Sequence, residues 1–473
     1  MNNIFTIQRS AHWECIARDR TKKTVRTGNS YHCRISAVYS QIIPEGLRVL
    51  ELGCGEGSLL AALKPLYGVG VDFVPEMIEA ARRRHPEYRF EVGDVHEIDL
   101  AEQFDAIVLS DLVNDVWDVQ QLFANIARHS HPGTRVVINA YSHLWEQPLK
   151  LTQALGLSTP LLQQNWLTLE DISDLLYLED MEIIKHFQEI VLPLPLGLIS
   201  KFCNTFLVRF TPFRQLALTN FIVARPMARV RQTNLPTVSV IIPARNEAGN
   251  IRGLLERTPD MGSSTEIIFV EGNSSDNTWD TIERLLPEFK HRDCKLFKQS
   301  GKGKGDAVRV GFAQAKGDIL MILDADMTVP PEDLPRFYEA IRSGKGEFIN
   351  GVRLVYPMED KAMRFLNLLG NKFFSLAFSW LLGQPIKDTL CGTKVMWRKD
   401  YERVAANRSY FGEFDPFGDF DLIFGAAKLN LKIVDVPIRY RERVYGDTNI
   451  QRFRHGLILL KMVIFAAKKI KFI

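Results

Sequence analysis

Two aspartates one residue apart, Asp324 and Asp326, are the residues of this 473-residue sequence best suited to bind a metal ion. They follow the short apolar run 319–323, which contains no turn residue and indicates a buried parallel strand. Carboxylates at the carboxyl end of such a strand lie where open α/β sheets bind ligands. They repel each other unless a positive charge sits between them. We therefore expect a hard divalent cation that also holds a diphosphate, with a solvated surface turn as the alternative.

Two strand–loop–helix units and a glycine–lysine loop precede these aspartates and must bring further polar residues to the same sheet. Residues 237–243 form a β-rich run that opens into the polar loop 244–250. Residues 266–270 are a second strand, and the loop 271–278 after it is crowded with short hydrogen-bonding side chains. Residues 301–305 read Gly-Lys-Gly-Lys-Gly before a helix, so they either meet a phosphate or form a solvated loop.

This ordered series resembles the family 2 glycosyltransferases, whose nucleotide-sugar domain has the GT-A fold, over about residues 236–445. The resemblance implies that Asp324 and Asp326 bind Mg²⁺ or Mn²⁺ on the diphosphate of a nucleotide-sugar donor. It also implies a nucleotide cleft and contacts to the base, ribose and phosphates. The residues implied in that role are Pro243, Arg245, Asn246, Glu247, Glu271, Asp276, Lys304 and Asp306.

Within that family the sequence looks most like the dolichyl/polyprenyl-phosphate sugar transferases. The stretches that carry this likeness are 351–353, 388–392 and 443–449. Two departures stand out: Thr328 occupies a position where that subgroup usually has Gln, and no lysine accompanies Thr448 and Asn449.

The chemistry of the acceptor decides which further residues take part. A lipid phosphate is already ionised, so it needs arginines such as Arg353, Arg364 and Arg443 to hold it. A hydroxyl acceptor needs a carboxylate to take its proton, and Asp419 and Asp421 are the candidates. Their alternative role is to cap the N-terminus of a helix. Both acceptor classes, a polyprenyl phosphate and a glycan, remain open.

The first half begins its own series of strands with a glycine-rich turn. The strand 48–52 contains an acid, Glu51, and runs into the turn Gly53-Cys54-Gly55-Glu56-Gly57 before the helical stretch 58–66. Glycines at a strand-to-helix turn let the backbone approach a ligand closely. Their spacing is G-x-G-x-G, which differs from the G-x-G-x-x-G of dinucleotide domains.

Further strands in this half, all but the last of which end in an acid, predict a doubly wound parallel sheet. They cover 69–72, 90–94, 104–111 and 135–140, whereas residues 150–225 are apolar and expected to be helical. The series resembles the Rossmann-like S-adenosylmethionine-dependent methyltransferases over roughly 31–145. The resemblance implies a cofactor site in which three glycines underlie the methionine part, an acid holds the ribose, and an acid and its neighbour face the adenine. These residues are Gly53, Gly55, Gly57, Asp72, Asp94 and Val95, with Glu51 beside them.

The methyl acceptor is not fixed by these motifs. A hydroxyl or amine acceptor needs a base, and the candidates near the fourth strand are Asp111, Asn114, Asp115 and His143. Each has an alternative as a solvated side chain or a helix cap. For the whole half, the alternatives are a nucleotide-binding fold without chemistry or a dehydrogenase.

Bulk composition limits the setting of the protein. Hydrophobic residues make up 46% of the chain, which supports packed cores, and the net charge of +3 is too small to indicate nucleic-acid binding. The six cysteines form no close pair or zinc-like spacing, which is typical of a reducing compartment, and we expect a cytoplasmic location. No clean apolar run reaches the ~18 residues of a membrane span.

Three apolar stretches bear on membrane contact. Residues 362–383 and 456–473 are amphipathic, and they either lie on a membrane surface, at its inner face, or are buried helices with solvated lysines. The Phe- and Leu-rich residues 190–221 are a core extension, a domain contact or a membrane-facing surface, of which we favour the domain contact.

The sequence as a whole predicts an α/β protein with two Rossmann-like three-layer domains. The expected boundaries are a lead-in at 1–30, a methyltransferase domain at 31–224, a linker at 225–236 and a glycosyltransferase domain at 237–473. The predicted function is methyl transfer from S-adenosylmethionine together with metal-dependent sugar transfer, in the synthesis of a cell-envelope glycan or glycolipid. The alternative is a ligand-binding scaffold with one or both halves inactive.

Overall fold

The computed structural model describes residues 8–15, 26–154, 162–194, 196–227, 235–353, 365–407, 418–441, 443, 445 and 452–472, without the side chains of 26–30, 365–369 and 452–457. The chain divides into two compact units, Met1–Met227 with Phe472–Ile473, and Ala228–Lys471. The linker expected at 225–236 stays a prediction, because 228–234 lie outside the described residues, as do Arg364, Thr448 and Asn449.

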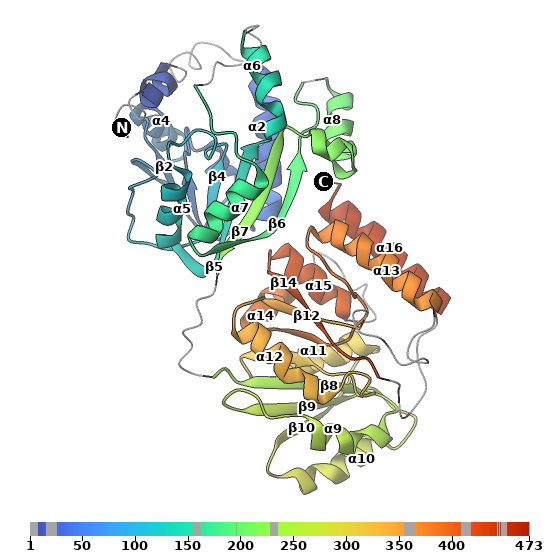
Figure 1. Ribbon diagram of the computed structural model, residues 1–473. Coiled ribbons are helices and arrows are strands. Elements are labelled where there is room, and N and C mark those ends of the chain that lie inside the picture. The colour runs from blue at the N-terminus through green and yellow to red at the C-terminus, as the bar shows by residue number, and fades with distance from the viewer. Residues whose placement is uncertain are drawn as a thin grey trace. The chain divides into compact units, whose positions relative to one another are not determined.

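The first unit is built on one seven-stranded sheet with the strand order β3-β2-β1-β4-β5-β7-β6 (Figure 1). Strands β1 to β5 pair in parallel, and β7 pairs antiparallel with both β5 and β6. The strands are β1 (Arg48–Leu52), β2 (Tyr67–Asp72), β3 (Arg89–Val92), β4 (Phe104–Ser110), β5 (Ser130–Tyr141), β6 (Met181–Glu189) and β7 (Thr219–Pro226).

Helices cover both faces of this sheet because successive strand side chains point to opposite sides. Leu50 and Ile107 belong to a core shared with α5 and α7, whereas Val49 and Val108 belong to a core shared with α2, α3 and α4. The helices of the first unit are α2 (Arg26–Ile42), α3 (Ser58–Ala62), α4 (Pro75–Arg84), α5 (Val119–Arg128), α6 (Glu146–Ala154), α7 (Leu169–Leu178) and α8 (Leu198–Thr205).

The helical expectation for residues 150–225 is wrong in part, because β6 and β7 lie within this range. The apolar run Phe221–Ala224 is fully buried and pairs with Val136–Asn139 of β5. A short apolar run fits a buried strand as well as a buried helix, and periodicity alone does not separate them. The pairing with β5 decides the matter in favour of a strand.

The second unit also has one seven-stranded sheet, with the order β10-β9-β8-β11-β13-β12-β14. All its pairings are parallel except those of β13, which runs antiparallel to β11 and β12. The strands are β8 (Val238–Ala244), β9 (Thr265–Glu271), β10 (Asp293–Lys298), β11 (Ile319–Ile322), β12 (Phe348–Val352), β13 (Lys394–Trp397) and β14 (Ile433–Pro437).

Helices again lie on both faces of the second sheet. Helices α9, α10 and α12 share a core with one face of the strands. Helix α11 packs on the other face, where a Cβ at Gly311 would overlap Ile241. The helices are α9 (Ile251–Arg257), α10 (Thr278–Leu285), α11 (Lys304–Gln314), α12 (Leu334–Arg342), α13 (Phe365–Leu382), α14 (Arg398–Ala406), α15 (Asp419–Lys428) and α16 (Arg452–Ile470).

Helices α13 and α16 lie side by side in the second unit (Figure 1). Within the described part of the chain, no helix combines the length and the apolar character that crossing a bilayer requires. The predicted fold class, two α/β domains with Rossmann-like sheets, is confirmed by the two strand orders.

Candidate functional site

The polar loops of the second unit gather at a topological switch point of its sheet. The chain runs outward from β8 to β9 and β10 and then returns to the other side of β8 as β11, so the strand order reverses between β8 and β11. Ligands of open α/β sheets bind at the carboxyl ends of strands at such a point. The loops after β8, β9 and β11 carry most of the residues that the sequence predicted to bind a nucleotide sugar.

Asp324 follows β11 and forms an ion pair with Lys304, the first residue of α11. The Lys304 Nζ lies 2.5 Å from Asp324 Oδ1 and 4.0 Å from Asp419 Oδ1. Burial would raise the pKa of the Asp324 carboxyl, but Lys304, together with the charges of Lys394 and Arg353, keeps this pKa below its usual value. Burial would lower the pKa of Lys304, but Asp324 and Asp419 raise it above its usual value. Both groups therefore stay charged at neutral pH.

Asp326, the second acid of the pair, is held by the chain on both of its oxygens. The backbone N–H and the hydroxyl of Thr328 donate to Asp326 Oδ1 at 3.1 and 2.8 Å. The Arg443 guanidinium donates to Asp326 Oδ2 at 2.7 Å and to Glu247 Oε1 at 3.0 Å. Thr328, which replaces the Gln usual in the related subgroup, thus orients the acid. Arg443 connects two loops that are far apart in the sequence.

Glu247 has an unusual protonation equilibrium at this site. Burial raises the pKa of its carboxyl to about 7, although Arg443 and the amide of Asn250 act in the opposite direction. The negative charge of Asp326 also raises this pKa. Glu247 therefore changes its charge near neutral pH, next to the guanidinium that also holds Asp326.

The two acids and their surroundings suit a divalent cation that is shared with a diphosphate. Among the described residues, no group of three or more His, Cys, Asp or Glu could hold a metal by itself. Mg²⁺ commonly takes one or two carboxylates and completes its shell with phosphate oxygens and water. Gly392 packs against the pair, and a Cβ there would overlap both the Asp324 carboxylate and the Lys304 ammonium. This donor set fits Mg²⁺ or Mn²⁺ bound together with a donor, not a metal bound by protein alone.

The loops after β8 and β9 are tied to each other by hydrogen bonds. The Ser275 N–H donates to Asn246 Oδ1 at 2.8 Å, and the Ala248 N–H donates to Asp276 Oδ2 at 3.4 Å. The Ser274 N–H donates to the buried carboxylate of Glu271 at 2.5 Å. Asn246 has a φ of +58°, a left-handed conformation that asparagine tolerates better than most residues.

The remaining predicted contacts lie around this frame. Pro243 is half-buried near the end of β8, and Arg245 is exposed just after that strand. Asp306 accepts a hydrogen bond from the Gly301 N–H at 2.7 Å, so it shapes the glycine–lysine loop. Lys304, by contrast, points at Asp324.

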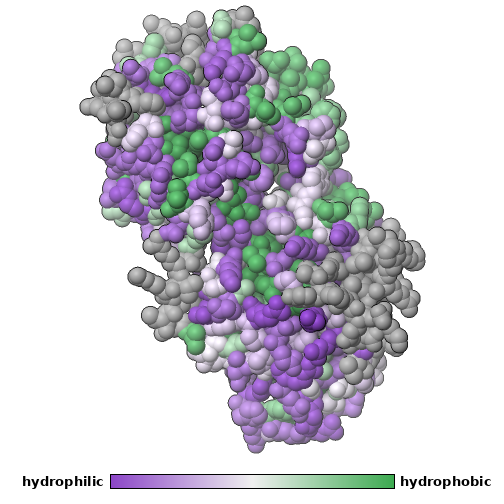
Figure 2. All heavy atoms as spheres, in the orientation of Figure 1, coloured by the Kyte–Doolittle hydropathy of each residue, from purple (hydrophilic) through white to green (hydrophobic). Residues whose placement is uncertain are grey.

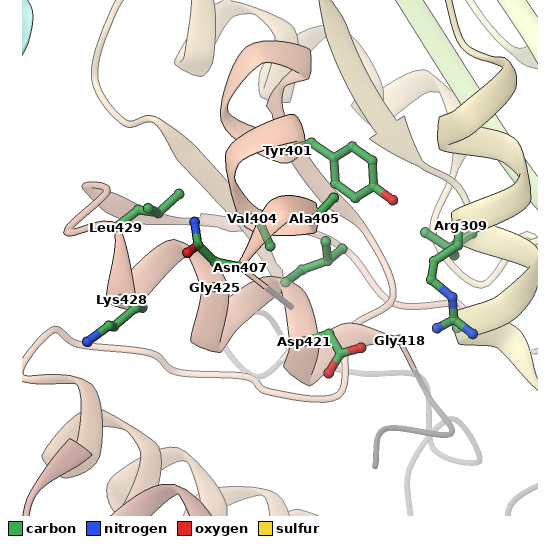
Figure 3. A pocket seen from close by; sticks show the side chains of 13 residues that line it. Arg309, Tyr401, Val404, Ala405, Asn407, Gly418, Asp421, Gly425, Lys428 and Leu429 are labelled. Atoms are coloured by element: carbon green, nitrogen blue, oxygen red, sulfur yellow. The ribbon is translucent and has the colours of Figure 1, made fainter. Parts of the chain in front are cut away.

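Asp419 and Asp421 point to different places, although only one residue separates them. They occupy the first turn of α15, where residues two apart lie about 200° around the helix axis. Asp419 lies near Lys304. Asp421 lines a cavity of about 160 Å³ between α11, α14 and α15, with Arg309 and Tyr401 across from it (Figure 3). Only Asp419 therefore joins the cluster around Asp324.

Arg353 forms a buried ion pair with Asp388. It makes two parallel hydrogen bonds to Asp388, at 2.7 and 2.8 Å, and the Asp388 side chain is fully buried. A bidentate buried pair of this kind fixes the turn that follows Asp388. The guanidinium of Arg353 is therefore occupied by Asp388, and its contact with a phosphate stays a prediction that requires this pair to open.

Sequence reasoning missed Lys394, which lies on β13 and is 1% exposed. Its ammonium donates to the Cys391 carbonyl, and its positive charge also lowers the pKa of Asp324. The signal was weak, because a lysine within the short apolar strand Lys394–Trp397 is easily taken for a solvated residue. Its burial follows from the central place of β13 between β11 and β12.

In the first unit, the turn after β1 depends on glycine at three positions. Gly53, Gly55 and Gly57 have φ values of +73°, +51° and +76°, a region that glycine enters without strain. A Cβ at Gly57 would overlap the ring of Phe90. The Gly55 N–H donates to Asp72 Oδ2 at 2.9 Å, so the acid at the end of β2 holds the glycine turn in place.

Glu51 lies beneath the same turn and is almost completely buried. The Leu60 N–H donates to Glu51 Oε2 at 2.9 Å, which satisfies a free donor in the first turn of α3. Burial raises the pKa of the Glu51 carboxyl to about 8, and it raises the pKa of Asp72 as well. Glu51 supports the turn from below, and its place in the cofactor site stays a prediction.

The loop after β3 keeps its acid close to its own backbone. The His96 N–H donates to Asp94 Oδ1 at 2.9 Å, and the His96 ring lies against the same oxygen, which lowers the pKa of Asp94. Val95 is buried, and its carbonyl accepts a hydrogen bond from the Asn125 amide at 2.7 Å. Hydrogen bonds within the first unit therefore hold this loop in place at the carboxyl edge of the sheet.

The four candidate bases have different surroundings. Asp111, at φ +54°, accepts hydrogen bonds from the Tyr31 hydroxyl at 2.8 Å and the Asn139 amide at 2.5 Å. Burial raises its pKa to about 6 against these two hydrogen bonds. The side-chain amide of Asn114 donates to the Asn165 carbonyl, and its oxygen accepts from the Tyr141 N–H. His143 is exposed.

Asp115 is paired with the helical segment 8–15. Arg9 forms an ion pair with Asp115, and the Trp13 indole N–H donates to Asp115 Oδ2 at 2.8 Å. Trp13 also packs against Val74 and Met77, which follow β2. Segment 8–15 therefore lies over the loops after β2 and β4, and Asp115 anchors it.

Each half of the chain contains a match to a known protein family. Residues 239–404 match the family Glycosyl transferase family 2, and residues 49–133 match the family Methyltransferase domain. A dolichol-phosphate mannosyltransferase from Pyrococcus furiosus is 30% identical over 219 residues, 45% of this chain and 59% of that protein. An undecaprenyl-phosphate 4-deoxy-4-formamido-L-arabinose transferase from Edwardsiella ictaluri is 35% identical over 227 residues, 47% of this chain and 64% of that protein.

A solved S-adenosylmethionine-dependent methyltransferase from Mesorhizobium loti is 19% identical to this chain, with a TM-score of 0.31. The match includes 40% of this chain and 95% of the Mesorhizobium loti chain. The chain spans less than two thirds of either glycosyltransferase relative. It contains a family 2 glycosyltransferase domain and a methyltransferase domain, which confirms both resemblances seen in the sequence.

The buried pair of Arg353 and Asp388 should carry a large share of the stability of the second unit. Replacing Arg353 by Met leaves Asp388 buried without its cation, so we expect a loss of about 3–5 kcal/mol in the free energy of unfolding. Urea denaturation of the full chain measures it. The surface pair of Arg342 and Glu339 is the control, and Arg342→Met should cost less than about 1 kcal/mol. Equal losses for the two variants would contradict the structural role of Arg353.

The raised pKa of Glu51 should make stability depend on pH. Between 4.5 and about 8 the folded protein keeps the Glu51 proton that the unfolded chain has lost, so stability falls as pH rises through this window. Glu51→Gln removes that dependence. The free energy of unfolding of the variant, relative to the wild type, should therefore rise by up to about 1.4 kcal/mol per pH unit. The exposed Glu79 is the control, since Glu79→Gln should show no such trend.

Proposed function

We propose that the chain is a bifunctional transferase. Its second unit transfers a sugar from a nucleotide-sugar donor to a polyprenyl phosphate, and its first unit transfers a methyl group from S-adenosylmethionine. The observation that supports sugar transfer by the second unit is the cluster of Lys304, Asp324, Asp326 and Arg443 at the carboxyl end of β11. The names of the two glycosyltransferase relatives support the class of acceptor.

Sugar transfer breaks the bond between the anomeric carbon and the donor diphosphate and forms a bond from that carbon to the acceptor oxygen. Negative charge builds up on the departing diphosphate, and fixed cations stabilise it as it develops. A bound Mg²⁺ or Mn²⁺ supplies such charge. In the chain itself, Lys304 and Arg443 are the cations next to Asp324 and Asp326, so they are placed to share the leaving diphosphate.

A phosphate acceptor explains the surroundings of Asp419. A polyprenyl phosphate is ionised and needs no base, so Asp419 has no proton to remove. Its distance of 4.0 Å from Lys304 supports a different role, in which it positions that ammonium and raises its pKa. A glycan hydroxyl as acceptor would instead require Asp419 as the base, because Asp421 lies in a separate cavity.

The long amphipathic helices of the second unit support a membrane setting for this acceptor. Phe373 and Leu376 on α13, and Ile464 on α16, are exposed. Lys372 and Lys461 lie on the same helices. Apolar faces edged by lysine bind the surface of an anionic bilayer. We infer that the second unit works at the inner face of the membrane, in the synthesis of a cell-envelope glycan or glycolipid.

For the first unit we propose methyl transfer at the loops after β1, β2, β3 and β4. The methyl carbon leaves the sulfur of S-adenosylmethionine and bonds to an acceptor oxygen or nitrogen, whose proton passes to a base. Asp111 is the best placed of the four candidates, because Asp115 is paired with Arg9 and Asn114 is committed to the backbone. With a pKa of about 6, the Asp111 carboxylate is largely ionised at neutral pH.

The metal and donor site predicts a selective loss of sugar transfer. Asp324→Asn removes the charge that pairs with Lys304, so transfer from a nucleotide sugar to polyprenyl phosphate should fall by about 10²-fold or more. A panel of labelled nucleotide sugars with Mn²⁺ measures it, and thermal stabilisation by Mn²⁺ with a nucleoside diphosphate gives a second readout. The exposed Asp260 is the control, and Asp260→Asn should behave like the wild type. Full transfer by Asp324→Asn would refute the proposed site.

The cofactor site predicts an independent loss in the other half. Asp72→Asn weakens the hydrogen bond to the Gly55 N–H and removes the charge expected to hold the ribose, so affinity for S-adenosylmethionine should fall at least tenfold, or about 1.4 kcal/mol. Titration calorimetry on the full chain measures it. Sugar transfer should be unaffected, and the exposed Glu97 provides the control variant Glu97→Gln. Unchanged cofactor affinity would remove Asp72 from the site.

A further inference from the structure

The connection between β6 and β7 presents an unusual surface. These neighbouring antiparallel strands are joined by residues 190–218, which include α8 and two short 3₁₀ helices, Leu207–Arg209 and Phe213–Leu216. Nine large apolar side chains of this connection are between 39% and 84% exposed. We call them the insertion face: Leu194, Leu196, Leu198, Ile199, Phe202, Phe206, Phe210, Phe213 and Leu216.

Figure 2 shows apolar atoms gathered over α8, at the place that α8 occupies in Figure 1. Proteins that stay in water rarely expose contiguous apolar patches of this kind, because each large side chain gains about 1.5–3 kcal/mol on burial. Single exposed leucines are common and need no explanation, but nine within 23 residues do. The Phe472 ring packs against Phe206, with their centroids 5.2 Å apart, and lies near Phe210, yet both of these side chains stay about 40% exposed. Most of the insertion face therefore still needs an occupant.

The connection is anchored from beneath by its polar groups. Arg209 and Arg34 both pair with the buried carboxylate of Glu189, at 2.5 and 2.9 Å. The Asn204 side chain accepts from the Leu192 N–H and donates to the Leu192 carbonyl, each at 2.8 Å. The polar contacts are turned inward and the apolar side chains outward, so the face is built into the fold.

The charges around the face select the occupant. Residues 190–218 contain no Asp or Glu, and their three cations are Lys201, Arg209 and Arg214. Arg209 is buried against Glu189, whereas Lys201 and Arg214 are exposed beside the phenylalanines. Phe and Leu side chains edged by cations and free of acids suit the boundary between the headgroups and acyl chains of an anionic bilayer. A partner protein fits this face less well, because a protein surface carries charges of both signs.

We propose that the insertion face docks the methyltransferase unit on an anionic membrane. This inference extends the proposed function, which places only the second unit at a membrane. It gives the first unit its own lipid contact, built from residues outside its cofactor site. The two proposals fail separately, because the insertion face and the helices α13 and α16 carry different residues that a local probe can distinguish.

A fluorophore on the face tests the proposal directly. In full-length protein whose Cys15, Cys33, Cys203 and Cys294 are replaced by Ser, the variant Ile199→Cys carries an environment-sensitive dye. Vesicles of equal parts phosphatidylglycerol and phosphatidylcholine should shift its emission to the blue, and brominated lipids should quench it. The same dye at Leu66→Cys, on a leucine of the same unit that is even more exposed than Ile199, should not respond.

Sedimentation with the same vesicles gives the energetic test. Leu198→Asp with Phe202→Asp should weaken binding at least about tenfold, whereas the matched control Leu66→Asp should bind like the wild type. Lys201→Glu and Arg214→Glu should each weaken binding roughly fivefold on anionic vesicles, and should have no effect on vesicles of phosphatidylcholine alone.

Three outcomes would overturn the proposal. Vesicle binding without a response of the dye at position 199 would assign the membrane contact to another part of the chain, and the proposed sugar transfer would survive. A dye at 199 that is already shielded before vesicles are added would show that protein covers the face, either another copy or the rest of the chain. Unchanged binding of the Leu198 and Phe202 double variant would remove the face from any lipid contact.

Discussion

Repulsion between two neighbouring carboxylates is the constraint on which the second unit depends. Asp324 and Asp326 cannot lie together at the end of β11 unless positive charge compensates them. The chain supplies that charge from distant segments: Lys304 from the start of α11 and Arg443 from beyond β14. Because Arg443 also binds Glu247, the same compensation joins the loops after β8 and β11. The ion pairs that hold the acids thus also draw together the loops that would receive a nucleotide.

The first unit solves a related problem with backbone N–H groups in place of side-chain cations. Asp72 accepts from Gly55 and Glu51 accepts from Leu60, so two buried acids orient the turn between β1 and α3. Burial raises the pKa of both, and at about 8 the Glu51 carboxyl is mostly protonated at neutral pH. Because Glu51 is mostly neutral, the charges beside the glycines are those of Asp72 and of Glu56, which pairs with Arg84.

The sequence predicted those features that are local in the chain. The run 319–323, the acids after it and the glycine turn at 53–57 are read from neighbouring residues, and all three appear as expected. Partners across the fold were not predictable in the same way. The residues around Arg353 in the sequence do not indicate that Arg353 pairs with Asp388. The residues around Lys394 do not indicate that Lys394 is buried. The different surroundings of Asp419 and Asp421 could have been predicted from the sequence, because residues two apart on a helix face different sides.

The charge balance of the second site supports the need for a divalent cation. Four carboxyls, those of Asp324, Asp326, Asp419 and Glu247, meet two directly paired cations, Lys304 and Arg443. Lys394 adds a third positive charge at greater distance, and Glu247 is only partly ionised near pH 7. The cluster thus has no surplus of positive charge to attract a diphosphate. A hard dication at the two aspartates would reverse that sign and would leave the Lys304 ammonium available to the phosphates. The pairing of Asp324 with Lys304 is therefore compatible with a metal-dependent transferase, because the lysine neutralises the acid until donor and metal bind together.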